Sequence, residues 1–233
     1  MRFSERSRFE TTPNALSERV EARTAPYLDL TESNPTRAGL PVPTEAIARA
    51  LAEGAAHPYA PDPLGPSSAR EAVARELERT TGATVDPNRV LLTASTSEAY
   101  ALLFQVLADP GDRVLVPAPS YLASSSTPAR VEGLSAMPYE LEYDGRGEVD
   151  LTGTPCPAEC TGTACVNPQQ PHGHGISAAD WGTLADAELP MIVDEVFLEY
   201  ALGETRLASA LGRPGPLRFV LGGLSKYAGL PHM

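Results

Sequence analysis

Basic residues are scarce in this sequence, and the shortage restricts the partners that the protein can bind. The chain has 18 Lys and Arg residues against 30 Asp and Glu residues, which gives a net charge of −12 at pH 7. Phosphate backbones and anionic lipid surfaces attract Lys and Arg, so an excess of carboxylates opposes binding to both. We therefore expect no nucleic-acid partner and no membrane partner, and a protein that acts on small molecules.

Long apolar runs are also lacking. A membrane-spanning helix needs roughly 18 apolar residues in succession, and no stretch of the sequence approaches that length. The first residues, MRFSERSRFETT, carry charges where a signal peptide has an apolar core. These observations predict a cytoplasmic protein.

Cysteine and histidine are few, and their spacing does not indicate a metal site. Cys156, Cys160 and Cys165 lie close together, but without the paired spacing of a zinc knuckle and without a histidine at ligand spacing among them. We expect free thiols in a reducing compartment and no bound metal. The 23 prolines are spread along the chain and indicate many short, stiff connections.

The order of apolar and polar segments predicts an α/β fold. After a loosely packed arm of about 30 residues, we expect helices over 43–54 and 67–82, joined by a rigid loop at 59–66. From residue 89 apolar strands alternate with helices. The expected strands are RVLLTA, RVLVPAP, GLSAMPYELEY, TACVN, MIVDEV and LRFVLGG; the expected helices are SEAYALLFQVLAD, a segment from 121, and SAADWGTLADA. This alternation predicts three αβα layers with a mainly parallel sheet.

Polar residues follow the predicted strands, at the edge where parallel sheets bind ligands. They are Ser95, Thr96 and Ser97; Pro119, Ser120 and Tyr121; Asn167 and Pro168; Asp194 and Glu195; and Ser225 and Lys226. The first group opens a predicted helix, whose positive end suits a phosphate. Taken alone, Ser97 is explained equally well as the N-cap of that helix.

The other groups also have alternatives. Asp194 ends an apolar strand, where a buried carboxylate needs a cation such as a protonated pyridine nitrogen, but it could instead bind a metal or cap the next segment. Asn167 can donate to a phenolate oxygen, or simply form a turn. Lys226 lies among small residues, and its amine can form an imine with an aldehyde cofactor if its pKa is lowered. A solvated surface lysine is the alternative.

Taken in order, these motifs resemble those of the class I/II aminotransferases, the fold-type I enzymes that depend on pyridoxal phosphate. The resemblance runs from about residue 28 to the end of the chain. The matching segments are LTESNPT ending at Thr36, with Gly39; Tyr59 with PDPLG; STSEA at 95–99; PSY at 119–121; NPQQPHG at 167–173; DEVF at 194–197; and LSK at 224–226. The resemblance implies an enzyme that moves an amino group between an amino acid and a 2-oxo acid, and a homodimer.

The resemblance also implies a role for each residue. Lys226 would form the Schiff base with pyridoxal phosphate and carry the proton during catalysis, Asp194 would keep the pyridine nitrogen protonated, Asn167 would donate to the ring's 3-oxygen, and Tyr121 would stack on the ring. The remaining contacts would be Ser95, Thr96 and Ser97 to the phosphate, Tyr59 to the phosphate of the neighbouring subunit, and Asn34 and Gly39 near the substrate.

Several positions depart from the usual family pattern. Phe197 replaces a tyrosine that donates to the 3-oxygen, so the pKa of the Schiff base would be less depressed. His172 replaces a small hydroxyl residue, and Gly223 replaces a serine that often binds the phosphate. These departures predict a divergent subgroup. Two other functions remain open: a lyase or decarboxylase with the same cofactor and fold, or an inactive binding or regulatory module.

The resemblance divides the chain at residue 42. Residues 1–42 would form the N-terminal arm and the start of the small domain, and residues 43–233 the cofactor-binding large domain. Family members continue past the lysine with a strand that lies beside RVLLTA and with the rest of the small domain. We therefore expect a fragment, incomplete at its C-terminus, with a gap in the sheet beside RVLLTA, exposed apolar side chains and doubtful activity of its own.

Overall fold

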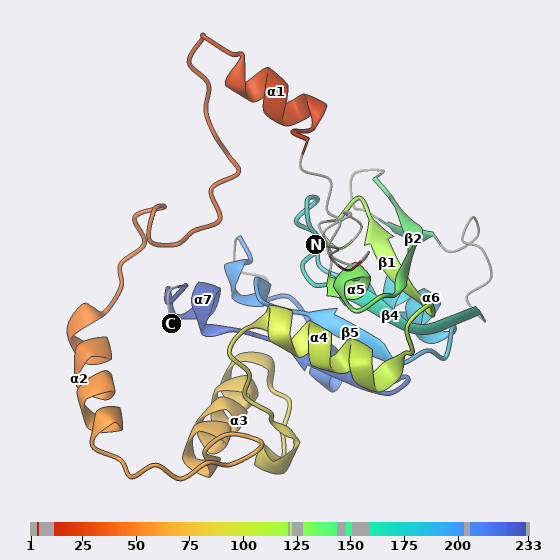
Figure 1. The fold of residues 1–233 in the computed structure, drawn as a ribbon. Helices are drawn as coiled ribbons and strands as arrows, with labels where there is room; N and C mark the ends of the chain where they lie inside the picture. The colour runs from red at the N-terminus through yellow and green to blue at the C-terminus, as the bar shows by residue number, and fades with distance from the viewer. Residues whose placement is uncertain are drawn as a thin grey trace.

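The computed structural model describes residue 4 and residues 12–120, 122, 128–143, 148–150, 159–202 and 206–231 (Figure 1). These residues form a six-stranded sheet with the order β3-β2-β1-β4-β5-β6. The strands are β1 (Arg113–Ala118), β2 (Ser135–Glu142), β3 (Glu148–Asp150), β4 (Cys160–Val166), β5 (Met191–Asp194) and β6 (Arg218–Leu221). Every neighbouring pair is parallel except β2 and β3. The predicted α/β fold with a mainly parallel sheet is confirmed.

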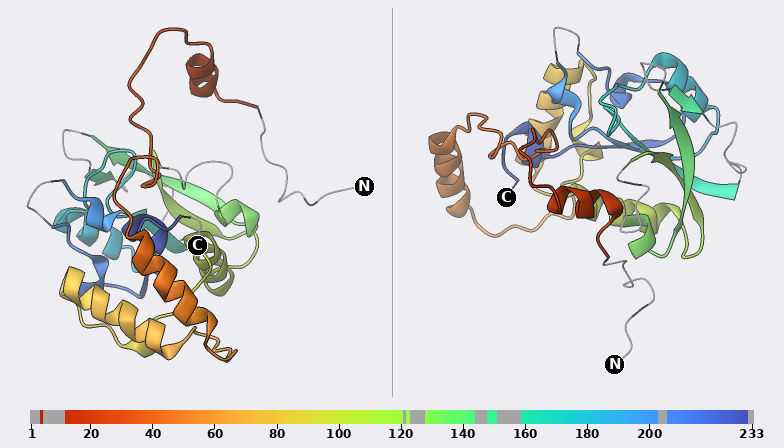
Figure 2. Two further views of the ribbon diagram at one scale, coloured as in Figure 1. Left: turned by 90° about the vertical axis from the view of Figure 1, so that its left-hand side faces the viewer. Right: turned by 90° about the horizontal axis from the view of Figure 1, so that it is seen from above.

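The described helices are α1 (Ala15–Glu21), α2 (Thr44–Ala55), α3 (Ser67–Thr81), α4 (Thr96–Leu107), α5 (Pro128–Val131), α6 (Ala178–Ala185) and α7 (Leu224–Tyr227). Helix α4 packs on one face of the sheet and α6 on the other. The right-hand view of Figure 2 shows the sheet between α4 and α6. The helices predicted over 43–54 and 67–82 are confirmed as α2 and α3. The helix predicted from residue 121 falls partly outside the described residues, which contain α5 in that region.

The strands are buried on both faces, which explains why their sequences are apolar throughout. Val114 and Val116 of β1 belong to the core cluster that contains Tyr100 of α4. Leu115, between them, belongs to the cluster that contains Trp181 of α6. Because side chains alternate along a strand, a sheet covered on both faces needs apolar residues at successive positions.

The prediction of a strand over RVLLTA, residues 89–94, is wrong: the segment is not part of the sheet. Arg89 ends a short 3-10 helix, and the backbone N–H of Leu92 donates to the carbonyl oxygen of Leu64 at 3.0 Å. No strand among the described residues pairs with this segment. Its contact is instead with the 59–66 loop. Leu91 is 51% exposed, in agreement with the expected exposure of apolar side chains in this segment.

Gly65 allows the 59–66 loop to pass close to Leu92. Its φ of +91° lies in the left-handed region, and a Cβ at this position would lie 2.8 Å from Cδ1 of Leu92. Any other residue would strain the backbone and collide with Leu92. Glycine therefore holds the loop against the segment that leads into α4.

The N-terminal segment stands away from the sheet. Helices α1 and α2 bury no residue, and Figure 1 shows both at a distance from the strands. No helix in the described part of the chain is both long enough and apolar enough to cross a bilayer. The division of the chain into an arm with the start of a small domain, up to residue 42, and a large domain from residue 43 stays a prediction.

Candidate functional site

The ends of β4, β5 and β6 bring the predicted site residues to one edge of the sheet. Val166 of β4 is in register with Asp194 of β5, which is in register with Leu221 of β6. The ladder continues past the strands, since the Asn167 N–H donates to the Asp194 carbonyl oxygen and the Glu195 N–H to that of Leu221, both at 2.8 Å. The polar residues that follow these strands therefore lie side by side.

Asp194 is a buried carboxylate at the end of β5, with 5% of its surface exposed. Its Oδ2 accepts a hydrogen bond from the hydroxyl of Tyr100 at 3.2 Å, and its Oδ1 accepts one from the Val196 N–H at 3.1 Å. Burying a carboxylate is costly without such donors, and a cation placed beside it would stabilise it further. Tyr100 lies on α4, so this bond fixes α4 relative to the end of β5.

The N-terminus of α4 carries the predicted phosphate site. Ser95 is its N-cap: the side chain accepts from the Glu98 N–H at 3.1 Å, and the Glu98 carboxylate accepts from the Ala94 N–H at 2.6 Å. The alternative that Ser97 caps this helix is therefore wrong. Ser97 is exposed, and the positive end of the helix is favourable for an anion.

The N-terminus of α4 lies against the segment that contains Lys226. A Cβ on Gly223 would lie 3.8 Å from Cγ2 of Thr96 and 3.7 Å from Oγ of Ser225. The structure therefore brings the start of α4 and the start of α7 together, although 127 positions separate Thr96 from Gly223 in the sequence.

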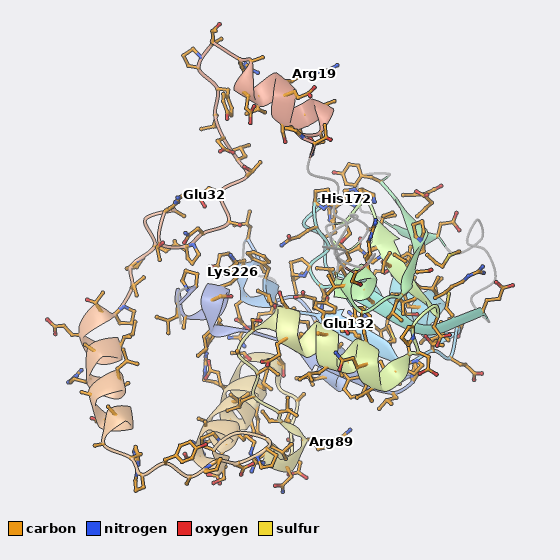
Figure 3. The ribbon with its side chains drawn as sticks, in the orientation of Figure 1. Arg19, Glu32, Arg89, Glu132, His172 and Lys226 are labelled. Atoms are coloured by element: carbon orange, nitrogen blue, oxygen red, sulfur yellow. The ribbon has the colours of Figure 1, made fainter. Side chains whose placement is uncertain are left out.

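Lys226 is the only lysine in the sequence and lies on α7, where Figure 3 labels it. Its Nζ donates to the carbonyl oxygen of Ser33 at 2.9 Å and lies 5.5 Å from the centroid of the Phe197 ring. Its own carbonyl oxygen accepts from the Tyr200 hydroxyl at 3.0 Å. Lys226 is partly buried, and these contacts argue against a freely solvated surface lysine.

Both amide hydrogens of Asn167 already donate to groups within the protein. Its Nδ2 donates to Oε1 of Glu195 and to the carbonyl oxygen of Ala208, both at 3.0 Å, and its Oδ1 accepts from the Ile176 N–H at 3.2 Å. An amide nitrogen carries two hydrogens. A bond from Asn167 to a bound ring would therefore replace one of these contacts.

The loop that follows Asn167 contains buried polar atoms without partners. Among the described residues, Gln169 Oε1 and His172 Nδ1 are buried and accept or donate no hydrogen bond. The His172 ring, labelled in Figure 3, stacks on Tyr143 at 5.4 Å between centroids. Buried polar groups are ordinarily satisfied, so these two atoms leave hydrogen-bonding capacity for a bound polar group.

The other residues predicted for the site are Asn34, Gly39, Tyr59 and Tyr121. Asn34 follows Ser33 and is thus near Lys226, but its Oδ1 accepts from the N–H and the hydroxyl of Thr36. Gly39 has a φ of +74° in the turn that follows. Tyr59 is 93% exposed on the loop before α3. Tyr121 lies outside the described residues.

The cysteines were predicted to be free thiols that bind no metal. Both Cys160 and Cys165 are buried, Cys165 is a free thiol, and burial raises the pKa of the Cys165 thiol well above its usual value. Cys156 lies outside the described residues. Within the described ranges, no three His, Cys, Asp or Glu side chains are grouped as metal ligands would be.

Sequence reasoning missed two groups that shape the site, the Tyr100 hydroxyl and the Ser33 carbonyl oxygen. It placed Glu195 at the predicted ligand edge but gave its carboxyl group no role. Tyr100 gave a weak signal, because it follows Thr96 by one helical turn. Ser33 acts through its backbone, which carries no signal in residue type. The assembled arrangement offers an amine, a buried carboxylate and a helix N-terminus at one sheet edge, which suits a ligand with a carbonyl, a cationic group and an anionic group.

Comparison with known proteins assigns the chain to a family. A family model described as aminotransferase class I and II matches residues 25–232. The chain is 29% identical over 210 residues to a probable N-succinyldiaminopimelate aminotransferase of Mycobacterium tuberculosis, covering 87% of this chain and 51% of the relative. It is 40% identical over 97 residues to a probable aspartate/prephenate aminotransferase of Thermus aquaticus, covering 42% of this chain and 24% of the relative.

A solved structure of alanine aminotransferase from Pyrococcus furiosus has the same fold. It superposes with a TM-score of 0.75 at 25% identity, over 92% of this chain and 56% of that chain. This chain therefore spans only part of the length of the proteins it resembles. The family match over residues 25–232 and this superposition show that the chain belongs to the aminotransferase class I and II family.

Proposed function

We propose that the complete protein is an aminotransferase, which moves an amino group between an amino acid and a 2-oxo acid with pyridoxal phosphate as its cofactor. The observation that carries this proposal is the meeting of Lys226, Asp194 and the N-terminus of α4 at one edge of the sheet. The relatives described above are named as aminotransferases, which supports the same function.

The residues at this edge fit pyridoxal phosphate. The amine of Lys226 suits its aldehyde, the buried Asp194 carboxylate suits its protonated pyridine nitrogen, and the start of α4 suits its phosphate. The unpartnered Gln169 Oε1 and His172 Nδ1 offer further polar contacts at the same edge. When bound, the cofactor supplies an electron sink that weakens the bonds at the substrate's Cα.

The protein's own groups would bind, orient and move a proton. Lys226 Nζ would hold the aldehyde carbon and would later take the proton from the substrate's Cα. Asp194 would keep the ring nitrogen protonated, with the Tyr100 hydroxyl fixing the carboxylate. Ser95, Thr96 and Ser97, with the backbone N–H groups of α4, would hold the phosphate.

Three further contacts belong to the proposal. Tyr121 would stack on the ring, and Asn34 and Gly39 would lie near the substrate, next to Ser33 and Lys226. Asn167 was expected to donate to the ring's 3-oxygen; that contact would require it to give up Glu195 or Ala208.

We also propose a homodimer in the cytoplasm. Tyr59, 93% exposed, would reach the phosphate held by the neighbouring subunit, which makes the site incomplete in one subunit. The buried free thiol of Cys165 suits a reducing compartment. Sedimentation of the complete protein with and without Tyr59→Ala, alongside cofactor affinity, tests the shared site: weaker cofactor binding without loss of the dimer is expected.

The cofactor assignment is tested by mixing the chain with pyridoxal phosphate and recording the near-ultraviolet and visible spectrum. We expect a new absorbance band that is absent in Lys226→Ala and in Lys226→Arg, which keeps the positive charge. Because the sequence has one lysine, borohydride reduction followed by peptide mass spectrometry locates the adduct without ambiguity. An adduct at the N-terminal amine alone, or no adduct, would contradict the proposal.

Turnover by the complete protein separates the candidate reactions. Exchange of amino and oxo groups between two substrates supports an aminotransferase, whereas release of carbon dioxide or of a leaving group supports a decarboxylase or a lyase. A cofactor band without any turnover supports a binding module. The fold alone does not distinguish these reactions.

A further inference from the structure

Glu195, the residue after Asp194, is a buried acid that the proposed reaction does not use. Its Oε2 accepts from the Ser209 hydroxyl at 2.6 Å. Its Oε1 accepts from the Ala210 N–H at 2.7 Å and from the Asn167 amide at 3.0 Å. Burial raises the pKa of the Glu195 carboxyl group, and these donors partly offset that effect. Three donors from two separate segments, 209–210 and Asn167, thus converge on one carboxyl group.

Asn167 extends this network to the strand ends. Its backbone N–H donates to the Asp194 carbonyl oxygen at 2.8 Å, and its side chain bonds to Ala208 and Ile176 as well as to Glu195. The amide thereby joins the end of β4 to the end of β5 and to the segments at 176 and 208. Glu195 and the Ala208 carbonyl oxygen accept from the amide nitrogen and the Ile176 N–H donates to the amide oxygen, so all three fix the same orientation, and Glu195 is the only side chain among them.

We propose that Glu195 is a positioning residue: its carboxyl group locks the Asn167 amide, and through it holds Asp194 and the 167–174 loop in the arrangement that binds the cofactor. Asn167 then connects the end of β4 to the end of β5 through its hydrogen bonds. The effect on cofactor binding rests on the proposed function. The hydrogen bond by which Glu195 holds the Asn167 amide, called the lock below, does not.

The charged and titratable groups around Glu195 are few. Asp194 precedes it on β5, the Cys165 thiol lies on β4, and the Arg213 guanidinium is the attractive charge from the following segment. Arg213 donates to the carbonyl oxygens of Ile176 and Ser177 at 2.6 and 2.9 Å. Arg213 therefore acts electrostatically on Glu195 and contacts the backbone of Ile176, whose N–H donates to Asn167.

Trp181 reports on this network without any cofactor. It is the only tryptophan in the sequence, its indole N–H donates to the Pro214 carbonyl oxygen at 2.7 Å, and the Arg213 guanidinium lies 5.3 Å from its ring centroid. A change in the protonation of Glu195 alters the charge that Arg213 faces. The emission of Trp181 should respond to it.

The first experiment follows Trp181 emission against pH in the cofactor-free chain. We expect a transition in the wild type with a midpoint above the usual glutamate range, no such transition in Glu195→Gln, and a higher midpoint in Ser209→Ala, which removes a donor that lowers the Glu195 pKa. Glu53→Gln, an exposed change of the same chemistry on α2, should leave the wild-type curve unaltered. A flat wild-type curve, or a transition that persists in Glu195→Gln, overturns the lock.

The second experiment measures pyridoxal phosphate affinity. Loss of a buried hydrogen-bond acceptor in Glu195→Ala should weaken binding by about tenfold or more. Glu195→Gln should restore most of it, because its amide oxygen can accept from Asn167 and Ala210 while the Ser209 hydroxyl reverses and accepts. Equal losses in both variants, or none in either, overturn the positioning role. If the wild type binds no cofactor, the proposed function fails, and the emission titration still tests the Glu195 network on its own.

Discussion

The hydroxyl of Tyr100 on α4 donates to Oδ2 of Asp194 at the end of β5, over 3.2 Å. The helix whose N-terminus suits an anion is thereby joined to the acid that suits a cation. Both positions are fixed by one buried contact between residues 94 positions apart. This contact would set the distance between the group that binds the cofactor's phosphate and the group that binds its ring nitrogen.

Removing this contact should cost both stability and affinity. Tyr100→Phe keeps the ring in the core but leaves the buried Asp194 with one donor fewer, so we expect a loss of about 1.5–3 kcal/mol in the free energy of unfolding. Tyr143→Phe is the matched control, since Tyr143 is 62% exposed, and it should change stability by less than about 0.5 kcal/mol. Urea denaturation followed by circular dichroism measures both. Equal stabilities for the two variants would show that the contact contributes little.

Restoring tyrosine at position 197 should lower the pKa at which the bound cofactor titrates. Phe197→Tyr adds a hydroxyl group beside Lys226, whose Nζ lies 5.5 Å from the present ring centroid. If the hydroxyl group donates to the ring oxygen of bound pyridoxal phosphate, the pH at which the bound-cofactor absorbance titrates should fall relative to the wild type. Phe197→Leu, which supplies no hydroxyl, should not lower it. A pH titration of the visible spectrum measures this, and an unchanged midpoint in the tyrosine variant would place the hydroxyl elsewhere.

Glu195 should make the stability of the protein depend on pH. Burial raises its pKa in the folded state, so the folded protein holds this proton more tightly than the unfolded chain does. The resulting stabilisation is fully present below the unfolded pKa of about 4.3 and is lost as the pH rises through the higher folded value. Glu195→Gln does not titrate. Across that window, the free energy of unfolding of the wild type should therefore fall relative to that of the variant, and urea titrations at successive pH values would show this; a parallel course would contradict it.

Gly65 should resist substitution, because its backbone conformation and the nearby Leu92 leave no room for a side chain. Gly65→Ala places a Cβ 2.8 Å from Leu92 at a φ of +91°, and we expect a loss of at least about 1–3 kcal/mol in the free energy of unfolding. Gly54→Ala is the matched control, because nothing lies within 4 Å of its Cβ position in α2. Alanine there should stabilise the helix by about 0.5–1 kcal/mol. Thermal unfolding compares them, and a neutral Gly65→Ala would mean that the loop moves freely away from Leu92.

The sheet could be predicted because its strands are apolar on both faces. β1 and β5 place successive side chains in two different core clusters, as expected for parallel strands covered on both faces. RVLLTA has the same apolar character, yet it forms no strand. A segment forms a strand only when another strand pairs with it, and none of the described strands pairs with residues 89–94. The apolar pattern of a segment does not show whether such a partner is present.

The candidate site could be predicted in position but not in detail. The rule that ligands bind at the carboxyl ends of parallel strands located Asp194 and Lys226. It could not show that the Asn167 amide is occupied by Glu195 and Ala208, because Ala208 contributes only a backbone oxygen. Contacts to backbone atoms depend on the path of the chain, and the same holds for Ser33 and the amine of Lys226.

The hydrogen bond from Lys226 to Ser33 spans 193 positions of sequence. Contacts of such long range form late during folding, because closing a large loop costs entropy that only an already assembled partner can offset. The neighbourhood of the amine should thus be completed after the sheet beneath it has consolidated. The helices on either side of Ser33, α1 and α2, bury no residue, so this part of the chain should detach first when the protein begins to unfold. Lys226 would then lose its hydrogen bond to Ser33, while the emission of Trp181 would still be that of the folded core.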